Sequence, residues 1–130
     1  MTKTTTGGCF CGEIRYEITG DPVIQVMCFC EDCRSITGTD AYAGFMVKET
    51  EFHQLEGTPQ QHQRTSKEGR KVVRSFCRTC GTNLWGVTSF GLISVAAGTL
   101  DDPGLFQPKN KAFTEGAPHW ARIPEHLEDI

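Results

Sequence analysis

Seven cysteines in three tight groups constrain the fold of this chain more than any other feature of its sequence. The groups are Cys9 and Cys11, then Cys28, Cys30 and Cys33, then Cys77 and Cys80. An odd number of cysteines cannot all pair as disulfides, and gaps of one or two residues between cysteines are typical of metal ligands. We therefore expect metal–thiolate bonds, rather than disulfides, to hold distant parts of the chain together.

Length and composition indicate one domain. The chain has 130 residues, of which 38% are hydrophobic and 22% are charged, and this balance is typical of a single globular unit. Its net charge of −3 provides no positive field for nucleic acid. The apolar run at 92–97 is far shorter than a membrane span, and residues 1–8 lack the apolar segment of a secretory signal. We predict one cytoplasmic, zinc-binding domain over residues 1–130, with its core at about 8–120, a tail at 121–130, and neither nucleic-acid nor membrane partners.

Alternating polar and apolar residues indicate a mainly β fold. Ile14, Tyr16 and Ile18 alternate with polar residues and predict a half-buried strand over 13–18. Further strands are predicted over 23–27, 41–47 and 51–53, in a polar hairpin of 60–66 with 71–76, and in an apolar hairpin of 82–87 with 92–97. The last hairpin is the predicted core because it is almost continuously apolar.

Little helix is expected. Residues 34–38 leave room for at most one helical turn. Beyond Gly98 the chain is rich in proline and glycine, which predicts a segment that wraps the surface without joining the sheet. Its end is predicted as a short helix over 124–130, because Pro124 suits a first helical position and Leu127 and Ile130 share a helical face.

The cysteine spacing favours two metal sites, one with four thiolates and one with three. Cys77 and Cys80, followed by Gly81, form a zinc knuckle in which a tight turn brings both sulfurs to one metal. Cys9 and Cys11 project the same way from an extended segment and supply a second pair. The two pairs close a structural site if the first strand lies beside the strand that leads into the knuckle.

Cys28, Cys30 and Cys33 remain as a three-sulfur set. Reactive zinc sites keep three protein ligands and an open position, whereas structural zinc sites are closed by four. Three thiolates give zinc a formal charge of 2 − 3 = −1, which disfavours hydrolysis and favours a soft fourth ligand such as a substrate thiolate. We therefore expect two zinc ions per chain, and a thiol that adds to a small electrophile at the second one.

Other assignments of the three-sulfur set remain open at this level. A fourth protein ligand would make it a second structural site, and the candidates are His53, His62, His119, His126, Glu31 and Asp32. Alternatively, the chain has one zinc site and three free thiols. These alternatives correspond to a zinc-stabilised interaction module without catalysis, or to a thiol redox sensor, since exposed thiolates of low pKa oxidise readily.

Four segments carry a family resemblance: Gly8-Cys9-Phe10-Cys11-Gly12, Cys28-Phe29-Cys30-Glu31-Asp32-Cys33-Arg34, Arg74-Ser75-Phe76-Cys77-Arg78-Thr79-Cys80-Gly81 and Gly98-Thr99-Leu100-Asp101-Asp102-Pro103. Together they resemble the glutathione-dependent formaldehyde-activating enzyme family, whose relatives include centromere protein V. The resemblance implies a β-tent fold, a structural zinc on the first and third cysteine groups, and a catalytic zinc on Cys28, Cys30 and Cys33. It also implies a carbon–sulfur lyase that joins glutathione, or another small thiol, to formaldehyde or a related small aldehyde, giving S-hydroxymethylglutathione.

Arg34 is the strongest non-cysteine candidate for the catalytic site. It directly follows Cys33, where it can lower thiolate basicity or contact an anionic substrate. Basic residues also gather in the 64–78 hairpin, at Arg64, Lys67, Arg70, Lys71, Arg74 and Arg78. We interpret them as the solvated face of the hairpin, except for Arg74 and Arg78, which flank the knuckle and can orient the carboxylates of glutathione.

Overall fold

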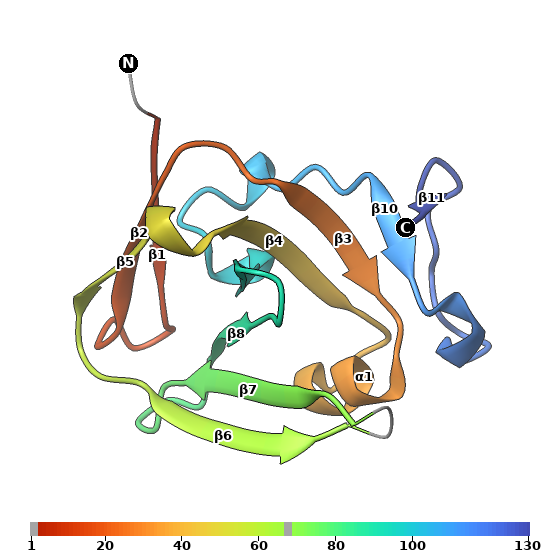
Figure 1. Ribbon diagram of the computed structural model, residues 1–130, viewed down its shortest axis with the longest axis horizontal. Helices are drawn as coiled ribbons and strands as arrows, with labels where there is room; N and C mark the ends of the chain where they lie inside the picture. The colour runs from red at the N-terminus through yellow and green to blue at the C-terminus, as the bar shows by residue number, and fades with distance from the viewer. Residues whose placement is uncertain (1–2, 67–68) are drawn as a thin grey trace.

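Short strands in two sheets dominate the computed structural model, which describes residues 3–66 and 69–130 (Figure 1). The strands are β1 (Thr4–Gly8), β2 (Arg15–Thr19), β3 (Ile24–Cys28), β4 (Tyr42–Lys48), β5 (Phe52–Glu56), β6 (Gln60–Thr65), β7 (Lys71–Phe76), β8 (Asn83–Val87), β9 (Leu92–Ala96), β10 (Asn110–Ala112) and β11 (Glu128–Asp129). The helices are α1 (Glu31–Thr37) and the short 3-10 helices η1 (Glu49–Glu51), η2 (Ala97–Thr99), η3 (Pro103–Leu105) and η4 (Thr114–Gly116). The mainly β class expected from the sequence is confirmed.

One sheet has three strands and the other has eight. The small sheet runs β1-β2-β5, and the large sheet runs β11-β10-β3-β4-β9-β8-β7-β6. The large sheet curls, so that β3 and β7 lie on opposite sides of the view in Figure 1. β1 and β7 belong to different sheets, so the two cysteine pairs do not meet through pairing of these strands, the arrangement under which the sequence was expected to close the four-thiolate site.

Alternation along β4 gives the large sheet two different faces. Phe45 and Val47 are buried in the core. Tyr42 and Met46, which point the other way, line a cavity on the opposite face, and Gly44 stands between them. One face of the sheet therefore builds the fold, and the other face is free to bind.

The core lies between the two sheets. Tyr16 of β2 is fully buried, and its ring packs edge-on against Trp85 of β8 at 6.0 Å between ring centroids. Phe52 of β5 meets the same indole at 4.7 Å. The apolar hairpin predicted over 82–87 and 92–97 is confirmed as β8 and β9, and it supplies much of this core. Both sheets thus share one hydrophobic core.

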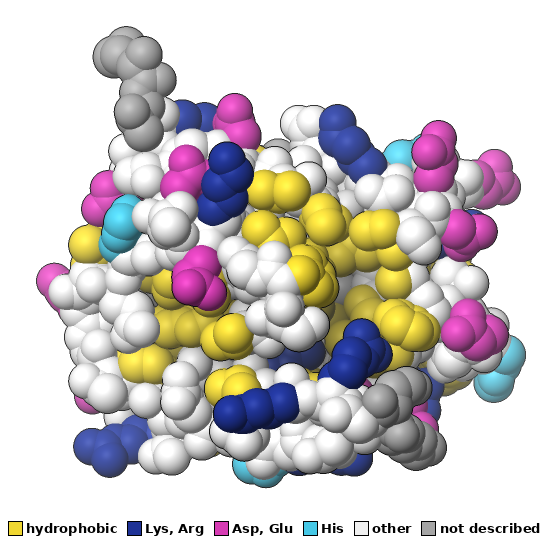
Figure 2. Space-filling model, viewed as in Figure 1, with side chains coloured by type: hydrophobic (Ala, Val, Ile, Leu, Met, Phe, Trp, Pro, Cys, Tyr) yellow, Lys and Arg dark blue, Asp and Glu magenta, His cyan; other side chains and the backbone are white. Residues whose placement is uncertain are grey.

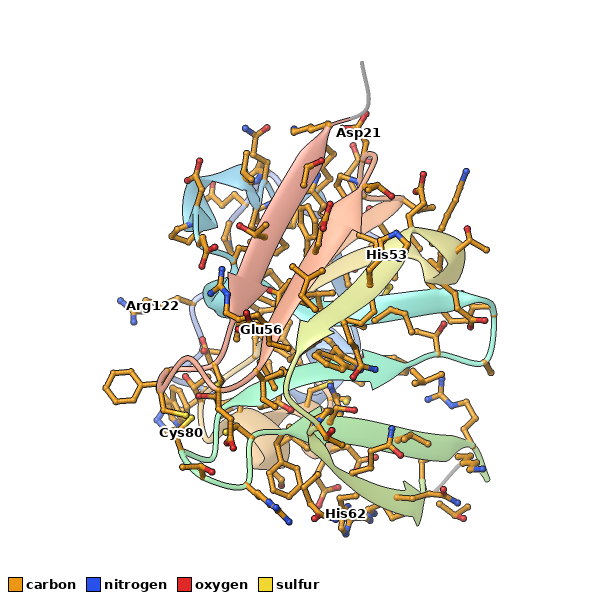
Figure 3. The ribbon with its side chains drawn as sticks, turned by 90° about the vertical axis from the view of Figure 1, so that its left-hand side faces the viewer. Asp21, His53, Glu56, His62, Cys80 and Arg122 are labelled. Carbon is orange, nitrogen blue, oxygen red and sulfur yellow. The ribbon has the colours of Figure 1, made fainter. Side chains whose placement is uncertain are left out.

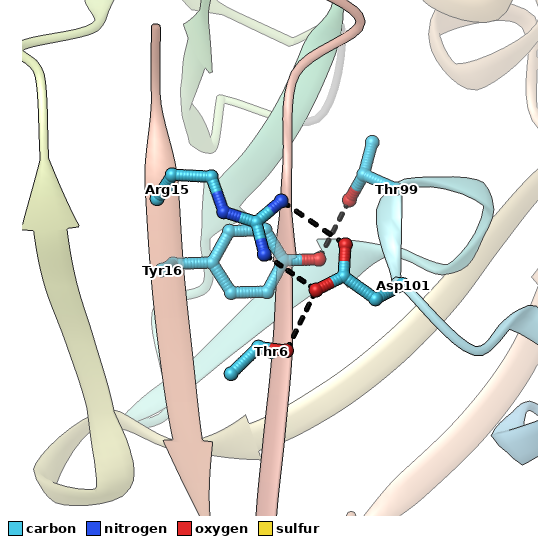
Figure 4. A network of polar contacts seen from close by, with 5 residues as sticks. All are labelled: Thr6, Arg15, Tyr16, Thr99 and Asp101. Atoms are coloured by element: carbon cyan, nitrogen blue, oxygen red, sulfur yellow. Dashed lines mark hydrogen bonds and ion pairs between the residues drawn. The ribbon is translucent and has the colours of Figure 1, made fainter. Parts of the chain in front are cut away.

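A polar network fastens the small sheet to the segment that follows β9 (Figure 4). Asp101 accepts hydrogen bonds from Thr6 at 2.7 Å and from both Nη atoms of Arg15. Beside them, the hydroxyl groups of Tyr16 and Thr99 are hydrogen-bonded at 2.7 Å. The network joins residues more than 80 positions apart, so it closes the fold around the core.

The chain beyond Gly98 joins the large sheet, contrary to the sequence prediction. β10 pairs in parallel with β3, with Ala112 beside Cys28, and β11 pairs with β10. Residues 124–130 form a turn followed by β11, not a helix, and Leu127 is buried there. The reason is long-range: pairing with β3 and β10 satisfies backbone groups that a short, isolated helix would leave exposed.

Helix α1 begins inside the second cysteine group. It has seven residues, about two turns, and it ends at Gly38 in the left-handed conformation with φ of 73°. The single turn predicted over 34–38 was therefore too short and started too late. Among the helices of residues 3–66 and 69–130, none has the length and apolar character needed to cross a membrane.

Candidate functional site

Four cysteines from two distant loops meet at one point. Cys9 and Cys11 follow β1, and Cys77 and Cys80 follow β7. Their Sγ atoms lie within 4.8 Å of one another, with 3.6 Å between Cys9 and Cys11 and 3.8 Å between Cys11 and Cys77. A tetrahedral metal with bonds of about 2.3 Å sets its sulfur ligands about 3.8 Å apart. The spacing of these thiols therefore fits a closed, four-coordinate metal site.

Tight turns and short polar contacts hold these four sulfurs in position. Gly81 has φ of 81°, and its N–H donates to the carbonyl of Cys77 at 2.7 Å, which closes the knuckle turn. The N–H of Ile14 donates to Cys9 Sγ at 3.2 Å. The Thr82 hydroxyl lies 3.2 Å from Cys80 Sγ and lowers the pKa of Cys80 to about 6. These contacts favour the thiolate form of Cys9 and Cys80, the form that binds a metal.

Cys28, Cys30 and Cys33 gather where β3 passes into α1. Their Sγ atoms lie within 4.8 Å of one another. Cys30 caps the helix, and its Sγ accepts a hydrogen bond from the N–H of Cys33 at 3.3 Å. Hydrogen bonds with the thiols of Cys28 and Cys33 lower the pKa of Cys30 to about 2, and those with Cys28 and Cys30 raise the pKa of Cys33. Negative charge therefore gathers first on Cys30.

Neither set of sulfurs includes a histidine or a carboxylate. In the described part of the chain, the two cysteine sets are the groups of three or more potential ligands that lie close enough to share one ion. Figure 3 shows His53 on β5 and His62 on β6, both well apart from Cys80. The three-sulfur set thus leaves a fourth coordination position to a ligand from outside the described chain.

A cavity of about 300 Å³ opens beside the three-sulfur set. Apolar side chains of β3 and β4 form one wall, on the sheet face opposite the core. The other wall belongs to the β6–β7 hairpin and carries Arg70, Lys71 and Arg74. Figure 2 shows hydrophobic side chains gathered in this hollow, with Lys and Arg side chains along its lower border.

Arg74 connects the cavity to the three-sulfur set. Its Nη2 lies 3.8 Å from Cys33 Sγ, and its guanidinium lies over the ring of Tyr42 at 4.7 Å. Its Nε is buried and makes no hydrogen bond within the described residues. A Cβ on Gly86, in the neighbouring strand, would come within 3.1 Å of Arg74 Nη1, so the glycine leaves room for the guanidinium. The arginine is held in place, and the buried Nε is a donor that the described residues leave unpaired.

Arg34 has a different position from the one its sequence neighbours suggest. It is absent from the residues that line the cavity, and its Nη1 donates to the carbonyl of Gly116 at 2.8 Å. This bond fastens α1 to the segment after β10. A direct catalytic role for Arg34 stays a prediction without a contact to support it.

The remaining basic residues of the hairpin divide between the cavity and the surface. Arg64 lies 3.9 Å from Asp32 of α1, and Arg78 is exposed on the knuckle. Lys67 lies outside the described residues. The interpretation of this hairpin as a solvated face was too simple, since Arg70 and Lys71 join Arg74 at the cavity.

Sequence reasoning missed the cavity residues that are not cysteines or arginines. Alternation of Tyr42, Gly44 and Met46 with core residues indicates a second sheet face as well as a strand. Phe113 also lines the cavity, and it is the non-glycine residue with positive φ among those described, at 55°. Its ring lies 5.9 Å from the guanidinium of Arg70. No local pattern marks Phe113 for this position.

Comparisons with known proteins agree with this geometry. The model of a family described as glutathione-dependent formaldehyde-activating enzyme matches residues 4–116. No curated protein matches the sequence significantly. Among solved structures, the crystal structure of a Rhodobacter sphaeroides protein matches with a TM-score of 0.59 and 17% identity, over 75% of this chain and 88% of that chain. At this identity, the likeness supports the fold alone.

Proposed function

Because the chain belongs to the glutathione-dependent formaldehyde-activating enzyme family, we propose that it promotes the addition of glutathione to formaldehyde or a related small aldehyde. The observation that carries the proposal is the set of Cys28, Cys30 and Cys33, whose sulfurs meet beside a cavity with no fourth ligand from the described residues. The activity is that of a carbon–sulfur lyase acting in the direction of synthesis. The seven free thiols suit a reducing compartment, so we retain the cytoplasm as the expected location.

We infer that zinc is the metal at both sites. Donor sets made only of thiolates select zinc over the harder divalent ions, and zinc accepts both closed and open coordination. Cys9, Cys11, Cys77 and Cys80 would hold the structural ion, and Cys28, Cys30 and Cys33 the reactive one. When bound there, zinc keeps a substrate thiol in its thiolate form at neutral pH.

The residues of the cavity wall suit the rest of glutathione. This tripeptide carries two carboxylates and one ammonium group, and Arg70, Lys71 and Arg74 bring positive charge to the cavity. Of these three, Arg74 is the one with a contact to the sulfurs, at 3.8 Å from Cys33 Sγ. A carboxylate that pairs with it would place the glutathione thiol near the cysteine set. The chain's own residues thus orient the nucleophile.

The proposed step is a balanced addition. The glutathione sulfur forms a bond to the carbonyl carbon, the π bond of the carbonyl group breaks, and the thiol proton ends on the aldehyde oxygen. The product is S-hydroxymethylglutathione, and no oxidant or reductant is consumed. The reverse reaction releases the same two reactants.

Exchange spectroscopy at equilibrium tests this proposal, because thiols also add to formaldehyde without a catalyst. We expect the wild-type protein to exchange free and bound formaldehyde faster than protein-free solution. Cys30→Ser should return the flux to the protein-free value, while Ser35→Ala, on the same helix, should keep the wild-type flux. A wild-type flux equal to that of the protein-free solution would contradict the enzyme proposal for formaldehyde and favour the interaction module.

A further inference from the structure

One wall of the cavity is apolar, and neither glutathione nor formaldehyde has an apolar part that would pack against it. Ile24 and Val26 of β3 and Met46 of β4 face the cavity, on the same side of the sheet as Cys28. Glutathione is polar along its whole length, and formaldehyde has no carbon beyond its carbonyl group. Neither molecule makes use of an apolar wall, because burial stabilises only apolar surface that leaves water.

The wall begins at the reactive set and continues away from it. Ile24, Val26 and Cys28 alternate along one strand, so the wall extends about 13 Å from the sulfurs at 3.3 Å per residue. Gly44 lies beside Val26 in the adjacent strand. A Cβ at Gly44 would come within 3.3 Å of Val26 Cγ1 and 3.1 Å of Ser94 Oγ, so the glycine keeps this part of the wall open.

Exposed apolar side chains extend the wall toward solvent. Phe90, in the β8–β9 turn, is 61% exposed, and Ile130, at the chain end, is 66% exposed. Both line the same cavity as Val26 and Met46. Apolar side chains that gather at the mouth of a cavity are typical of a site whose ligand covers them.

We propose that the preferred electrophile of this site is an aldehyde with an unbranched hydrocarbon tail of several carbons. The tail lies along the wall of β3 and β4, while the carbonyl carbon meets the thiol sulfur at Cys28, Cys30 and Cys33. The sulfur–carbon bond forms, the carbonyl π bond breaks, and the thiol proton ends on the oxygen. The inference rests on the proposed function and specifies its second substrate.

Binding of product analogues tests the wall without depending on turnover. Calorimetry with S-methyl-, S-butyl- and S-hexylglutathione should show the dissociation constant falling about fourfold for each added methylene that the wall covers, as the transfer of about 0.8 kcal/mol predicts. Met46→Gln and Ile24→Thr should flatten this dependence. Met27→Gln is the matched control, since Met27 is also half-buried, lies in the adjacent strand and is absent from the cavity lining. A flat dependence in the wild type would overturn the inference.

Exchange rates with different aldehydes separate this inference from the proposed function. We expect a larger excess over the uncatalysed rate for hexanal than for formaldehyde, each with glutathione. An excess for formaldehyde without one for hexanal overturns the inference and leaves the proposed function standing. No excess for either aldehyde overturns both. A larger excess for pentanethiol with formaldehyde than for glutathione with hexanal assigns the tail to the thiol, and it also overturns the inference.

Discussion

At the scale of single residues, two cysteines that can each bind a metal, Cys77 and Cys30, lie in very different surroundings. Cys77 is completely buried in the core cluster, whereas Cys30 lies at the border of the cavity and is only half-buried. Loss of a ligand from a closed site removes a bond between two distant loops. Loss of a ligand from the three-sulfur set affects one stretch between β3 and α1.

We therefore expect Cys77→Ser to unfold the domain and Cys30→Ser to leave it folded. The free energy of structural zinc binding, about 10–16 kcal/mol, is as large as the net stability of a typical domain, about 5–15 kcal/mol. Thermal unfolding followed by circular dichroism, in reduced buffer with zinc, measures the difference. If both variants lose the transition to the same degree, the three-sulfur set is structural.

Arg74 is a second residue whose role can be isolated. We expect Arg74→Gln to weaken glutathione binding about tenfold or more, because a charge-assisted hydrogen bond is lost. The same variant should bind glutathione diethyl ester as the wild type does, since the ester lacks the carboxylates. Arg78→Gln, on the exposed knuckle, is the matched control and should change neither affinity. Calorimetry gives both constants, and an equal loss for acid and ester would assign Arg74 a structural role.

The sequence identified the cysteines because metal ligation needs sulfur atoms at short spacing, a local property. Because Arg74 comes three residues before Cys77, its sequence position places it near the four-sulfur set. In the structure its guanidinium instead contacts Cys33 of the three-sulfur set. Position along the strand explains the difference, because Arg74 lies in the part of β7 that lines the cavity, whereas the knuckle lies beyond the strand end. Arg34 illustrates the same limit, since a residue next to a ligand need not point toward it.

At the scale of elements, the helix that carries Cys33 ends in a left-handed glycine. Gly38 adopts φ of 73° and its N–H donates to the carbonyl of Arg34 at 2.9 Å, which ends the helix. We expect Gly38→Ala to destabilise the protein by about 1 kcal/mol, since a Cβ is strained at positive φ even where space is free.

Gly98→Ala is the matched control for this element. Gly98, in η2, also has open space around its Cβ position but is not in the left-handed conformation. Its substitution should leave stability unchanged or raise it slightly, because alanine restricts the unfolded chain. Denaturant titration of both variants gives the two free energies of unfolding. An equal loss of unfolding free energy in both variants would show that the effect of Gly38→Ala does not come from the left-handed backbone conformation of Gly38.

The Arg15–Asp101 pair is the second element-scale test, because it joins β2 to the segment after β9. Hydrogen bonds from Arg15 and Thr6 hold the pKa of Asp101 below its usual value. An acid with a lowered pKa stabilises the folded state above its unfolded pKa, about 3.9, and loses that contribution as the pH falls below it.

Asp101→Asn should therefore lower the free energy of unfolding by the same amount at pH 8 and at pH 5.5. The side chain of Asp101 is 47% exposed, so we expect the cost to be at most about 1 kcal/mol and to shrink in concentrated salt. Asp21→Asn is the control. The ion pair of Asp21 with Lys3 is long, with 3.8 Å between Lys3 Nζ and Asp21 Oδ1, and the side chain of Asp21 is 81% exposed. Denaturant unfolding measures both, and a cost that grows as the pH falls from 8 to 5.5 would contradict this account.

The predicted strands agree with the structure where an apolar pattern marks them, by alternation in β2 and β4 and by continuous apolar runs in the β8–β9 hairpin. The prediction was wrong for β10, which has only three residues and owes its conformation to pairing with β3. It was also wrong for 124–130, where residues spaced like a helix face include one buried side chain, Leu127. Such elements depend on long-range contacts that periodicity does not contain.

At the scale of the whole molecule, the two faces of the large sheet and the two cysteine sets have different roles. The face of the large sheet that meets the small sheet forms the core, and the opposite face lines the cavity. The four-sulfur set joins the loops after β1 and β7, which belong to different sheets. The three-sulfur set lies at the cavity, where a ligand can reach it. Our central claim is that the first set holds the fold and the second set reacts.

Zinc analysis of the reduced, metal-replete protein tests this claim most directly. We expect two ions per chain, of which a mild chelator removes one first, because the three-sulfur set lacks a fourth protein ligand in the described chain. The circular dichroism spectrum should not change during this first loss, and Cys30→Ser should contain only the ion that resists the chelator. One ion or none in the wild type, or two ions that leave together as the protein unfolds, would contradict the claim.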